Sequence, residues 1–452
     1  MRTKQTLALL RDYESRNVLF TELDGSWPIV WERAKAVHVW DAEGKKYLDL
    51  TAAFGVAAAG HANPAVVRAG QKQMATLLHA MGDVHPHALK AQLARELSWI
   101  TFERWTAAAF VRTGQTSPVP AKKISRPLTS AATGKVIFCN SGFEAVEAAL
   151  KTAMLATGKA GVIAFENAYH GLGYGTLNAT HRGHFRGPFR AQLREFGSFL
   201  PFPKSDADLR SLLLAVKAIF RRERIGAILV EPIQARGGIN IPPPEFLPLL
   251  RKLCDEQGAL LILDEIYTGF GRTGKWFACE HSGVVPDLIC LGKALTGGFP
   301  LSACVGRADA MDAAWPESQG EAIHTSTFLG HPVGCAMALA QIYEIRRLKL
   351  CERSAKLGRM LLQKLSTLRP PSSILVSARG VGLMAGWELL NRDGSPATAE
   401  SLRIIKAMLH RGFILLPEGE HANVISFTPP LTITKAELAA SLVELGNVLT
   451  AD

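Results

Sequence analysis

The feature that most constrains the fold is a regular alternation of short apolar runs and longer helix-patterned runs in the middle of the chain. The apolar runs include KVIFC, GVIAF, GAILV, ALLILDE and DLICL, and the segments between them, such as EAVEAALKTAML and FLPLLRKLCDEQ, have apolar residues at helical spacing. Strands and helices that alternate in this way form βαβ units, in which helices cover both faces of a mainly parallel sheet. We therefore expect an α/β fold.

The pattern changes towards both ends of the chain. VHVWDAEGKKYLDL near the start predicts a β-hairpin, and after about residue 335 a long helix is followed by mixed strands and helices. We expect residues 1–60 to be an N-terminal segment that contributes to a small domain, 61–332 to form a large domain, and 333–452 to form the C-terminal part of the small α+β domain. The polar stretch at about residues 113–134 is predicted to be a long loop, either a functional rim segment or an insertion.

The charge of the chain suggests one function class that its distribution argues against. The chain has 51 Lys and Arg against 40 Asp and Glu, a formal net charge of +11. Clustered basic residues would indicate a nucleic-acid binder, but here they are scattered, with no basic stripe interleaved with aromatic residues. We expect no nucleic-acid partner, although the excess charge favours anionic substrates.

Cysteine usage and hydropathy bear on the compartment. The seven cysteines are never spaced as CxxC and lie mostly in apolar runs, which predicts buried thiols in a reducing compartment, without disulfides or a metal site. The N-terminal apolar segment is too short for a signal peptide, and no apolar run reaches the roughly 20 residues that a membrane span requires. We expect a cytoplasmic protein that does not enter a membrane.

Two charged residues follow apolar strands, where an unpaired charge would be costly. Asp264 ends LLIL, and Lys293 follows LICL and precedes the nearly uncharged ALTGGFPLSA. A cofactor that has a pyridine ring and an aldehyde needs a lysine amine for a Schiff base and a carboxylate that holds the ring nitrogen protonated. For Asp264, the competing interpretation is a salt bridge to Arg272, and the neighbouring Glu265 is an alternative for the paired acid. For Lys293, the competing interpretation is an exposed loop lysine, because most lysines are exposed.

Other polar and aromatic residues follow the predicted strands, where ligands of parallel sheets bind. Ser141, Gly142 and Phe143 lie at a strand-to-helix junction, so free backbone N–H groups there would suit an anion such as phosphate. Tyr169 beside a Gly-rich turn could stack on a planar ring, and His170 is interpreted as a structural histidine. Ser326 and Thr327 offer hydroxyls to a phosphate, although an ordinary loop explains them equally well.

The motifs taken together resemble the class III (ornithine/4-aminobutyrate type) aminotransferases of pyridoxal-phosphate fold type I. The resemblance covers nearly the whole chain and is carried by YLDL, GHANP, NSGFEAVEAALK, AYHG, EPIQARGG, LDEIYTGFGRTG, LGKALTGGFPLSA and HTSTF, all in the family's order. It implies a large domain, which binds pyridoxal 5'-phosphate, with a mainly parallel sheet of the seven-stranded type, and a smaller α+β domain from both termini. It also implies a homodimer with shared active sites.

The resemblance assigns roles to individual residues. Lys293 would hold the cofactor as an internal aldimine and carry the proton, Asp264 would pair with the pyridine nitrogen, and Thr327 would reach the phosphate of the partner subunit. Tyr169 and Ile266 would sandwich the ring, and the hydroxyl of Tyr267 would reach the phenolic oxygen. The expected cofactor site comprises Ser141, Gly142, Phe143, Tyr169, His170, Glu231, Gln234, Asp264, Ile266, Tyr267, Lys293, Ser326 and Thr327.

The departures from the family's motifs concern the substrate. Where many relatives have an arginine that binds a carboxylate, VISFTPPLTI has Ser426, and where ornithine-type members have a glutamate, EPIQARGG has Arg236. We therefore hypothesise that Arg236 binds an acidic group from the other side of the pocket. A solvent-facing Arg236 in an open, neutral pocket is the alternative. Phe54 stands where the ornithine enzymes have tyrosine and would make one wall apolar.

We expect an aminotransferase with a ping-pong cycle, in which an ω-amine or amino acid donor gives its amino group to an oxo acid or aldehyde. The alternative on the same fold is another reaction of the same cofactor: racemisation, an amino shift or decarboxylation. A noncatalytic binding protein that retains the fold would have lost Lys293 or Asp264, and both are present.

Overall fold

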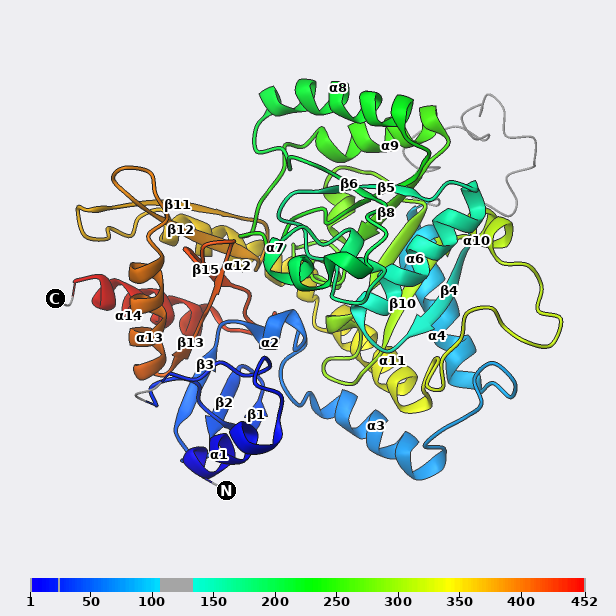
Figure 1. The fold of residues 1–452 in the computed structure, drawn as a ribbon. Coiled ribbons are helices and arrows are strands. Elements are labelled where there is room, and N and C mark those ends of the chain that lie inside the picture. Colours follow the sequence, from blue (N-terminus) through cyan, green and yellow to red (C-terminus); the bar gives the residue numbers. More distant parts are fainter. Residues whose placement is uncertain (1, 23–24, 106–132, 451–452) are drawn as a thin grey trace.

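A seven-stranded sheet forms the centre of the computed structural model, which describes residues 2–22, 25–105 and 133–450 (Figure 1). The strand order is β4-β10-β9-β8-β7-β5-β6, and β10 runs opposite to both of its neighbours while the other pairs are parallel. The strands are β4 (Gly134–Cys139), β5 (Gly161–Phe165), β6 (Gly197–Leu200), β7 (Ile225–Val230), β8 (Leu260–Asp264), β9 (Leu288–Leu291) and β10 (Ser302–Arg307). The mainly parallel α/β sheet predicted from the sequence is confirmed.

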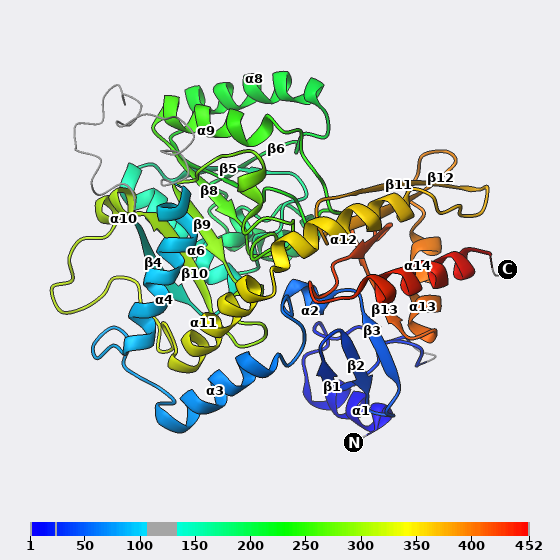
Figure 2. The same cartoon turned by 180° about the vertical axis from the view of Figure 1, so that it is seen from behind.

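Helices cover both faces of this sheet because each strand is apolar on both sides. In β5, Ile163 and Phe165 belong to one hydrophobic cluster and Val162 and Ala164 to another, as the period of two in a strand requires. The covering helices are α4 (Ala88–Ser98), α6 (Gly142–Thr157), α8 (Asp206–Arg222), α9 (Phe246–Gln257), α10 (Ala308–Ala314) and α11 (Pro332–Arg347), and α3 (Pro64–Thr76) packs on α11. Figure 2 shows α3, α4 and α11 on the rear of the molecule, whereas α6 is on the front in Figure 1.

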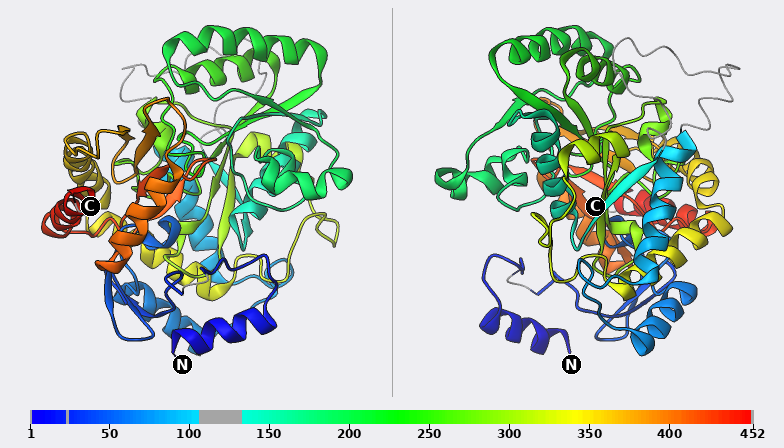
Figure 3. Two further views of the ribbon diagram at one scale, coloured as in Figure 1. Left: turned by 60° about the vertical axis from the view of Figure 1, so that its left-hand side comes forward. Right: turned by 90° about the vertical axis from the view of Figure 1, so that its right-hand side faces the viewer.

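A second sheet joins the two ends of the chain, in the order β1-β2-β3-β13. Its strands are β1 (Trp31–Lys35), β2 (His38–Asp41), β3 (Lys46–Asp49) and β13 (Phe413–Ile414). β2 and β3 form the predicted antiparallel hairpin, and β13 adds to β3 in parallel, with the Leu50 N–H donating to the Ile414 carbonyl oxygen at 3.0 Å. Helix α1 (Thr3–Tyr13) lies at the edge of the molecule near this sheet (Figure 3).

The third sheet, ordered β11-β12-β15-β14, belongs to the C-terminal part. Its strands and adjacent helices are β11 (Ile374–Gly380), β12 (Ala385–Asn391), β14 (Leu416–Glu418), β15 (Val424–Phe427), α12 (Leu350–Leu365), α13 (Thr398–His410) and α14 (Lys435–Thr450). The short helical segments are α2 (Ala52–Gly55), η1 (Trp99–Glu103), η2 (Thr176–Asn178), α7 (Gly183–Arg186), η3 (Gly187–Gln192), η4 (Ala278–His281) and η5 (Lys293–Leu295).

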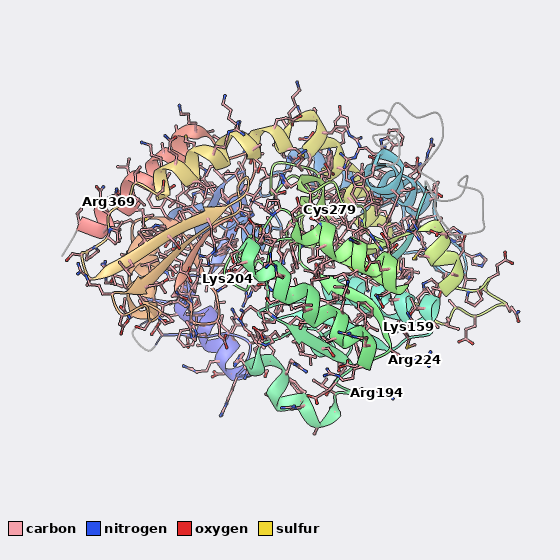
Figure 4. All side chains as sticks on the ribbon, turned by 90° about the horizontal axis from the view of Figure 1, so that it is seen from above. Lys159, Arg194, Lys204, Arg224, Cys279 and Arg369 are labelled. Carbon is pink, nitrogen blue, oxygen red and sulfur yellow. The ribbon has the colours of Figure 1, made fainter. Side chains whose placement is uncertain are left out.

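Some expectations concern the surface and the loops. Basic side chains come from opposite ends of the molecule, with Arg369 at one end and Lys159, Arg194 and Arg224 at the other (Figure 4). Within residues 2–22, 25–105 and 133–450, no helix has the length and apolarity that a membrane crossing requires. The loop predicted at about residues 113–134 lies outside the described residues except for its last two positions, and β4 begins at Gly134.

Candidate active site

A cavity of about 370 Å³ lies at the carboxyl ends of the parallel strands, where the sequence placed the candidate residues. Its volume is within the range of small-molecule sites. Of the candidate residues, those that line it are Gly142, Phe143, Tyr169, His170, Glu231, Arg236, Asp264, Ile266, Tyr267 and Lys293.

Asp264 ends β8 and is only 5% exposed. Its Oδ2 lies 2.8 Å from Nδ1 of the buried His170, and its Oδ1 accepts a hydrogen bond from the Ile266 N–H at 3.1 Å. The competing interpretation, a salt bridge between Asp264 and Arg272, is wrong. That guanidinium instead donates to the carbonyl oxygens of Leu383 and Pro429, at 2.9 and 2.6 Å.

Glu265, the alternative acid, faces away from the cavity. It accepts hydrogen bonds from the backbone N–H groups of Ala278 and Cys279, at 2.9 and 2.8 Å, and from the Thr268 hydroxyl at 2.5 Å. Because these donors satisfy it within the protein, Asp264 is the carboxylate that the strand presents to the cavity.

Lys293 begins the turn after β9 and lines the cavity, so it is not an exposed loop lysine. Its backbone is left-handed, with φ of 38°. Burial lowers the pKa of its ammonium group, although Asp264 and Glu231 oppose this by favouring the charged form. A lysine of lowered pKa is a competent nucleophile and proton carrier near neutral pH.

The N-terminus of α6 forms one end of the cavity, with Gly142 as its first residue. A Cβ at Gly142 would lie 3.0 Å from the Ile266 side chain, so glycine permits a close approach of the helix to this wall. The Glu144 carboxylate accepts the N–H of Ser141 at 3.2 Å. Among the described residues, the buried Ser141 hydroxyl oxygen has no hydrogen-bond partner. A helix N-terminus and a free hydroxyl together suit an anion.

Glu231 follows β7 and connects two loops of the cavity wall. Its carboxylate accepts the N–H groups of Tyr169 and Ala235, both at 3.0 Å, and burial raises its pKa to about 7. Gln234, expected to line the site, instead donates to the Glu166 carbonyl oxygen at 2.7 Å and is not part of the cavity wall.

Tyr267 lines the cavity. Its hydroxyl lies 3.1 Å from the Thr428 hydroxyl, and Nζ of Lys293 lies 4.3 Å from the centre of its ring. The ring, and not the hydroxyl, therefore faces Lys293. Tyr169 and Ile266 both line the cavity.

Besides Ser141 and Gln234, four further candidates lie outside the wall of this cavity. Ser326 and Thr327 are exposed, and the Ser326 hydroxyl is 3.5 Å from the side-chain amide nitrogen of Asn140. The buried Ser426 donates to the Leu416 carbonyl oxygen at 3.1 Å. Phe54 is 45% exposed, and the Arg236 guanidinium carbon lies 5.9 Å from the centre of its ring.

Arg236 pairs with a residue that sequence reasoning missed. Its Nε lies 3.6 Å from Oε2 of Glu418, a carboxylate at the end of β14. Burial raises the pKa of Glu418 to about 7, and the positive charges of Arg236 and Lys293 oppose this rise. The signal in the sequence was a glutamate directly after the apolar run FILLP, but its position depends on the pairing of β14 with β15.

Comparisons with known proteins agree over nearly the whole chain. Residues 21–449 match the family described as aminotransferase class-III. An acetylornithine aminotransferase of Methanosarcina mazei is 35% identical, covering 94% of this chain and 93% of its own. A 2-aminoadipate transaminase of Pseudomonas putida is 36% identical, covering 92% and 94%. The solved ornithine aminotransferase from Toxoplasma gondii has a TM-score of 0.80 and 27% identity, covering 99% and 95%.

Proposed function

Because the chain belongs to the class III aminotransferases, a family whose amino-group transfer depends on pyridoxal 5'-phosphate, we propose that Lys293 and Asp264 are its catalytic residues. The observation that carries this proposal is their convergence on one cavity that also contains the N-terminus of α6. An amine, a buried carboxylate and an anion cradle are the three groups that this cofactor requires.

The residues present fit the cofactor. The free hydroxyl of Ser141 and the backbone N–H groups of Gly142 and Phe143 would hold its phosphate. Asp264, oriented by His170, would pair with its ring nitrogen. When bound, the cofactor supplies an electron sink for the carbon that carries the amino group.

The protein's own contribution is to position groups and to move a proton. Lys293, whose pKa burial lowers, is the group that takes a proton from the substrate carbon and returns it. Asp264 would pair with the ring nitrogen, and its hydrogen bond with His170 fixes the orientation of its carboxylate. Tyr169 and Ile266 would cover the two faces of the ring.

The substrate pocket supports a donor that reacts through an amino group distant from any carboxylate. Ser426 stands where many relatives have a carboxylate-binding arginine, and its hydroxyl is bonded to the backbone of Leu416. Arg236 lines the cavity and is proposed to bind the acidic group of the oxo acid acceptor. The amino group would therefore pass from an ω-amine or amino acid donor to an oxo acid or aldehyde.

A homodimer with shared active sites belongs to the same proposal. Large apolar side chains are exposed near the Thr327 loop and after α3, as an interface would require. Thr327 would then reach the phosphate in the partner subunit. These side chains are Leu77, Leu78, Met81, Val84, Ile323 and Phe328.

We further propose a cytoplasmic enzyme with a large domain over residues 61–332. The first sixty residues and residues 333–452 would form the small domain, which is supported by the sheet shared between β3 and β13.

The test is visible absorption of the purified protein supplied with pyridoxal 5'-phosphate. We expect a cofactor band that one class of amine removes and an oxo acid restores in stoichiometric exchange, and we expect Lys293→Ala to abolish both changes. Conversion of the amine to an isomer, or loss of its carboxylate as CO2, without any use of an oxo acid would instead indicate racemisation, an amino shift or decarboxylation. The absence of a band in the wild-type protein would contradict the proposal.

A further inference from the structure

A second cavity, of about 310 Å³, lies beside the first and has a different chemical character. None of the side chains that line it carries a charge, and its one hydroxyl, on Thr51, already donates to the Asp49 carboxylate at 2.6 Å. We call it the apolar side pocket. Its wall includes Trp27, Ile29, Trp31, Phe54, Ile414 and Leu416.

Phe54 separates the apolar side pocket from the cofactor cavity. Its ring lines the side pocket, and its centre lies 5.9 Å from the guanidinium carbon of Arg236, which lines the cofactor cavity. Leu416 also lines the side pocket, and Glu418, two residues further along β14, pairs with Arg236. The two cavities therefore lie next to each other, with Phe54 and Arg236 between them.

The backbone that presents Phe54 is strained. Ala52, Ala53 and Phe54 have φ values of 49°, 49° and 60°, a left-handed conformation that is unfavourable for residues with a side chain. A buried carboxylate maintains this turn. Asp49 accepts the N–H groups of Thr51 and Ala53 at 2.8 and 3.1 Å.

This strain does not serve to bury Phe54, because its side chain remains 45% exposed and Trp31 remains 40% exposed. Residues that keep a strained backbone conformation without burying their side chains are found at ligand sites. Covering such exposed apolar surface with an apolar group is favourable in free energy, because the surface is removed from water.

We propose that the apolar side pocket binds an uncharged, apolar chain of the amine donor, the part remote from the reacting amino group. This inference rests on the proposed function and narrows its substrate class to amines with an extended hydrocarbon portion. The position of the pocket next to the cofactor cavity favours a substrate chain as the occupant, and the volume is within the range of small-molecule sites.

The test uses a series of straight-chain primary amines from propylamine to decylamine. The reaction of each amine is measured in single turnovers as the loss of the cofactor's visible band. Burial of each additional methylene should raise the apparent second-order rate constant about fourfold until the pocket is full. Binding of unreactive straight-chain alcohols, measured by calorimetry, should show the same dependence on length.

Variants at Ile29 locate the effect. Ile29→Trp fills the pocket and should lower the ratio of the rate constants for octylamine and propylamine about tenfold, whereas Ile29→Ala should shift the optimum to longer chains. Leu214→Trp, at a position 64% exposed on α8, is the matched control and should leave the ratio unchanged.

Three results would overturn the inference. Rate constants independent of chain length would do so, and so would an equal effect of Ile29→Trp on every amine. An unchanged ratio accompanied by dissociation of the Ile29→Trp protein in sedimentation would assign the pocket to a contact between copies of the chain. If no amine removed the cofactor band, the proposed function itself would fail.

Discussion

The Nε atom of Arg236 lies 3.6 Å from Oε2 of Glu418, so a positive and a buried negative charge stand side by side near Lys293. This separation is too long for a hydrogen bond, and Nε of Arg236 has no hydrogen-bond partner among the described residues. Arg236 is one-third exposed, whereas Glu418 is almost fully buried. The arginine is therefore available to a substrate carboxylate when protonation neutralises Glu418.

The first prediction concerns Arg236→Gln. Removing the guanidinium should raise the KM for acidic acceptors about tenfold or more, because a charge-assisted hydrogen bond to the carboxylate is lost, and should change the KM for neutral aldehydes much less. The measurement is steady-state kinetics with matched oxo acids and aldehydes. Arg194→Ala, at an exposed position, is the control. An unchanged KM for every acidic acceptor would mean that Arg236 is not the acid-binding group.

The second prediction concerns pH. The pKa of Glu418 is raised from its ordinary value of 4.5 to about 7 because burial disfavours the charged carboxylate, against the attraction of Arg236, Lys293 and Arg182. Because the pKa of Glu418 is higher in the native than in the unfolded state, the native state binds this proton more tightly. The stability that this binding contributes is present at low pH and is lost as the pH rises through about 7.

Protonation of Glu418 should free Arg236 for a substrate. We expect the KM for acidic acceptors, divided by that for neutral ones, to fall as the pH decreases through about 7. Glu231 and Glu265 titrate near the same pH, so the control is Glu418→Gln, which should flatten this profile at its low-pH level. A profile that Glu418→Gln leaves unchanged would assign the titration to another group.

The third prediction concerns the hydrogen bond between His170 and Asp264, 2.8 Å long and buried. His170→Phe should weaken binding of pyridoxal 5'-phosphate roughly tenfold to a hundredfold, because a hydrogen bond to a charged group contributes about 1.5–3 kcal/mol. Equilibrium dialysis of the cofactor measures this effect. His184→Phe replaces an exposed histidine and should leave the affinity unchanged. If His170→Phe bound pyridoxal 5'-phosphate as tightly as His184→Phe, His170 would have no role in orienting Asp264.

The sequence placed the strands and their carboxyl ends well because both depend on local patterns. Apolar runs of strand length predicted that Asp264 lies at the end of β8 and that Lys293 lies just after β9. The partners of these residues were harder to predict, because His170 and Asp264 are 94 positions apart and meet only through the order of the sheet. Arg272 was the nearest candidate in sequence, but it donates to the carbonyl oxygens of Leu383 and Pro429. Glu418 was missed for the same reason.

The last prediction separates the ring of Tyr267 from its hydroxyl. The hydroxyl is bonded to Thr428 and not directed at Lys293, so Tyr267→Phe should retain transamination within about threefold and lose only the roughly 1 kcal/mol of one hydrogen bond in stability. Tyr267→Leu removes the ring that lies 4.3 Å from Nζ of Lys293. That change withdraws a cation–π attraction that favours the charged lysine, so the pKa of Lys293 should fall further. The pH dependence of the rate at which the cofactor-free protein forms its visible band, together with single-turnover rates, measures both effects. If Tyr267→Phe were as impaired as Tyr267→Leu, the hydroxyl would act in catalysis through a rearrangement of this contact.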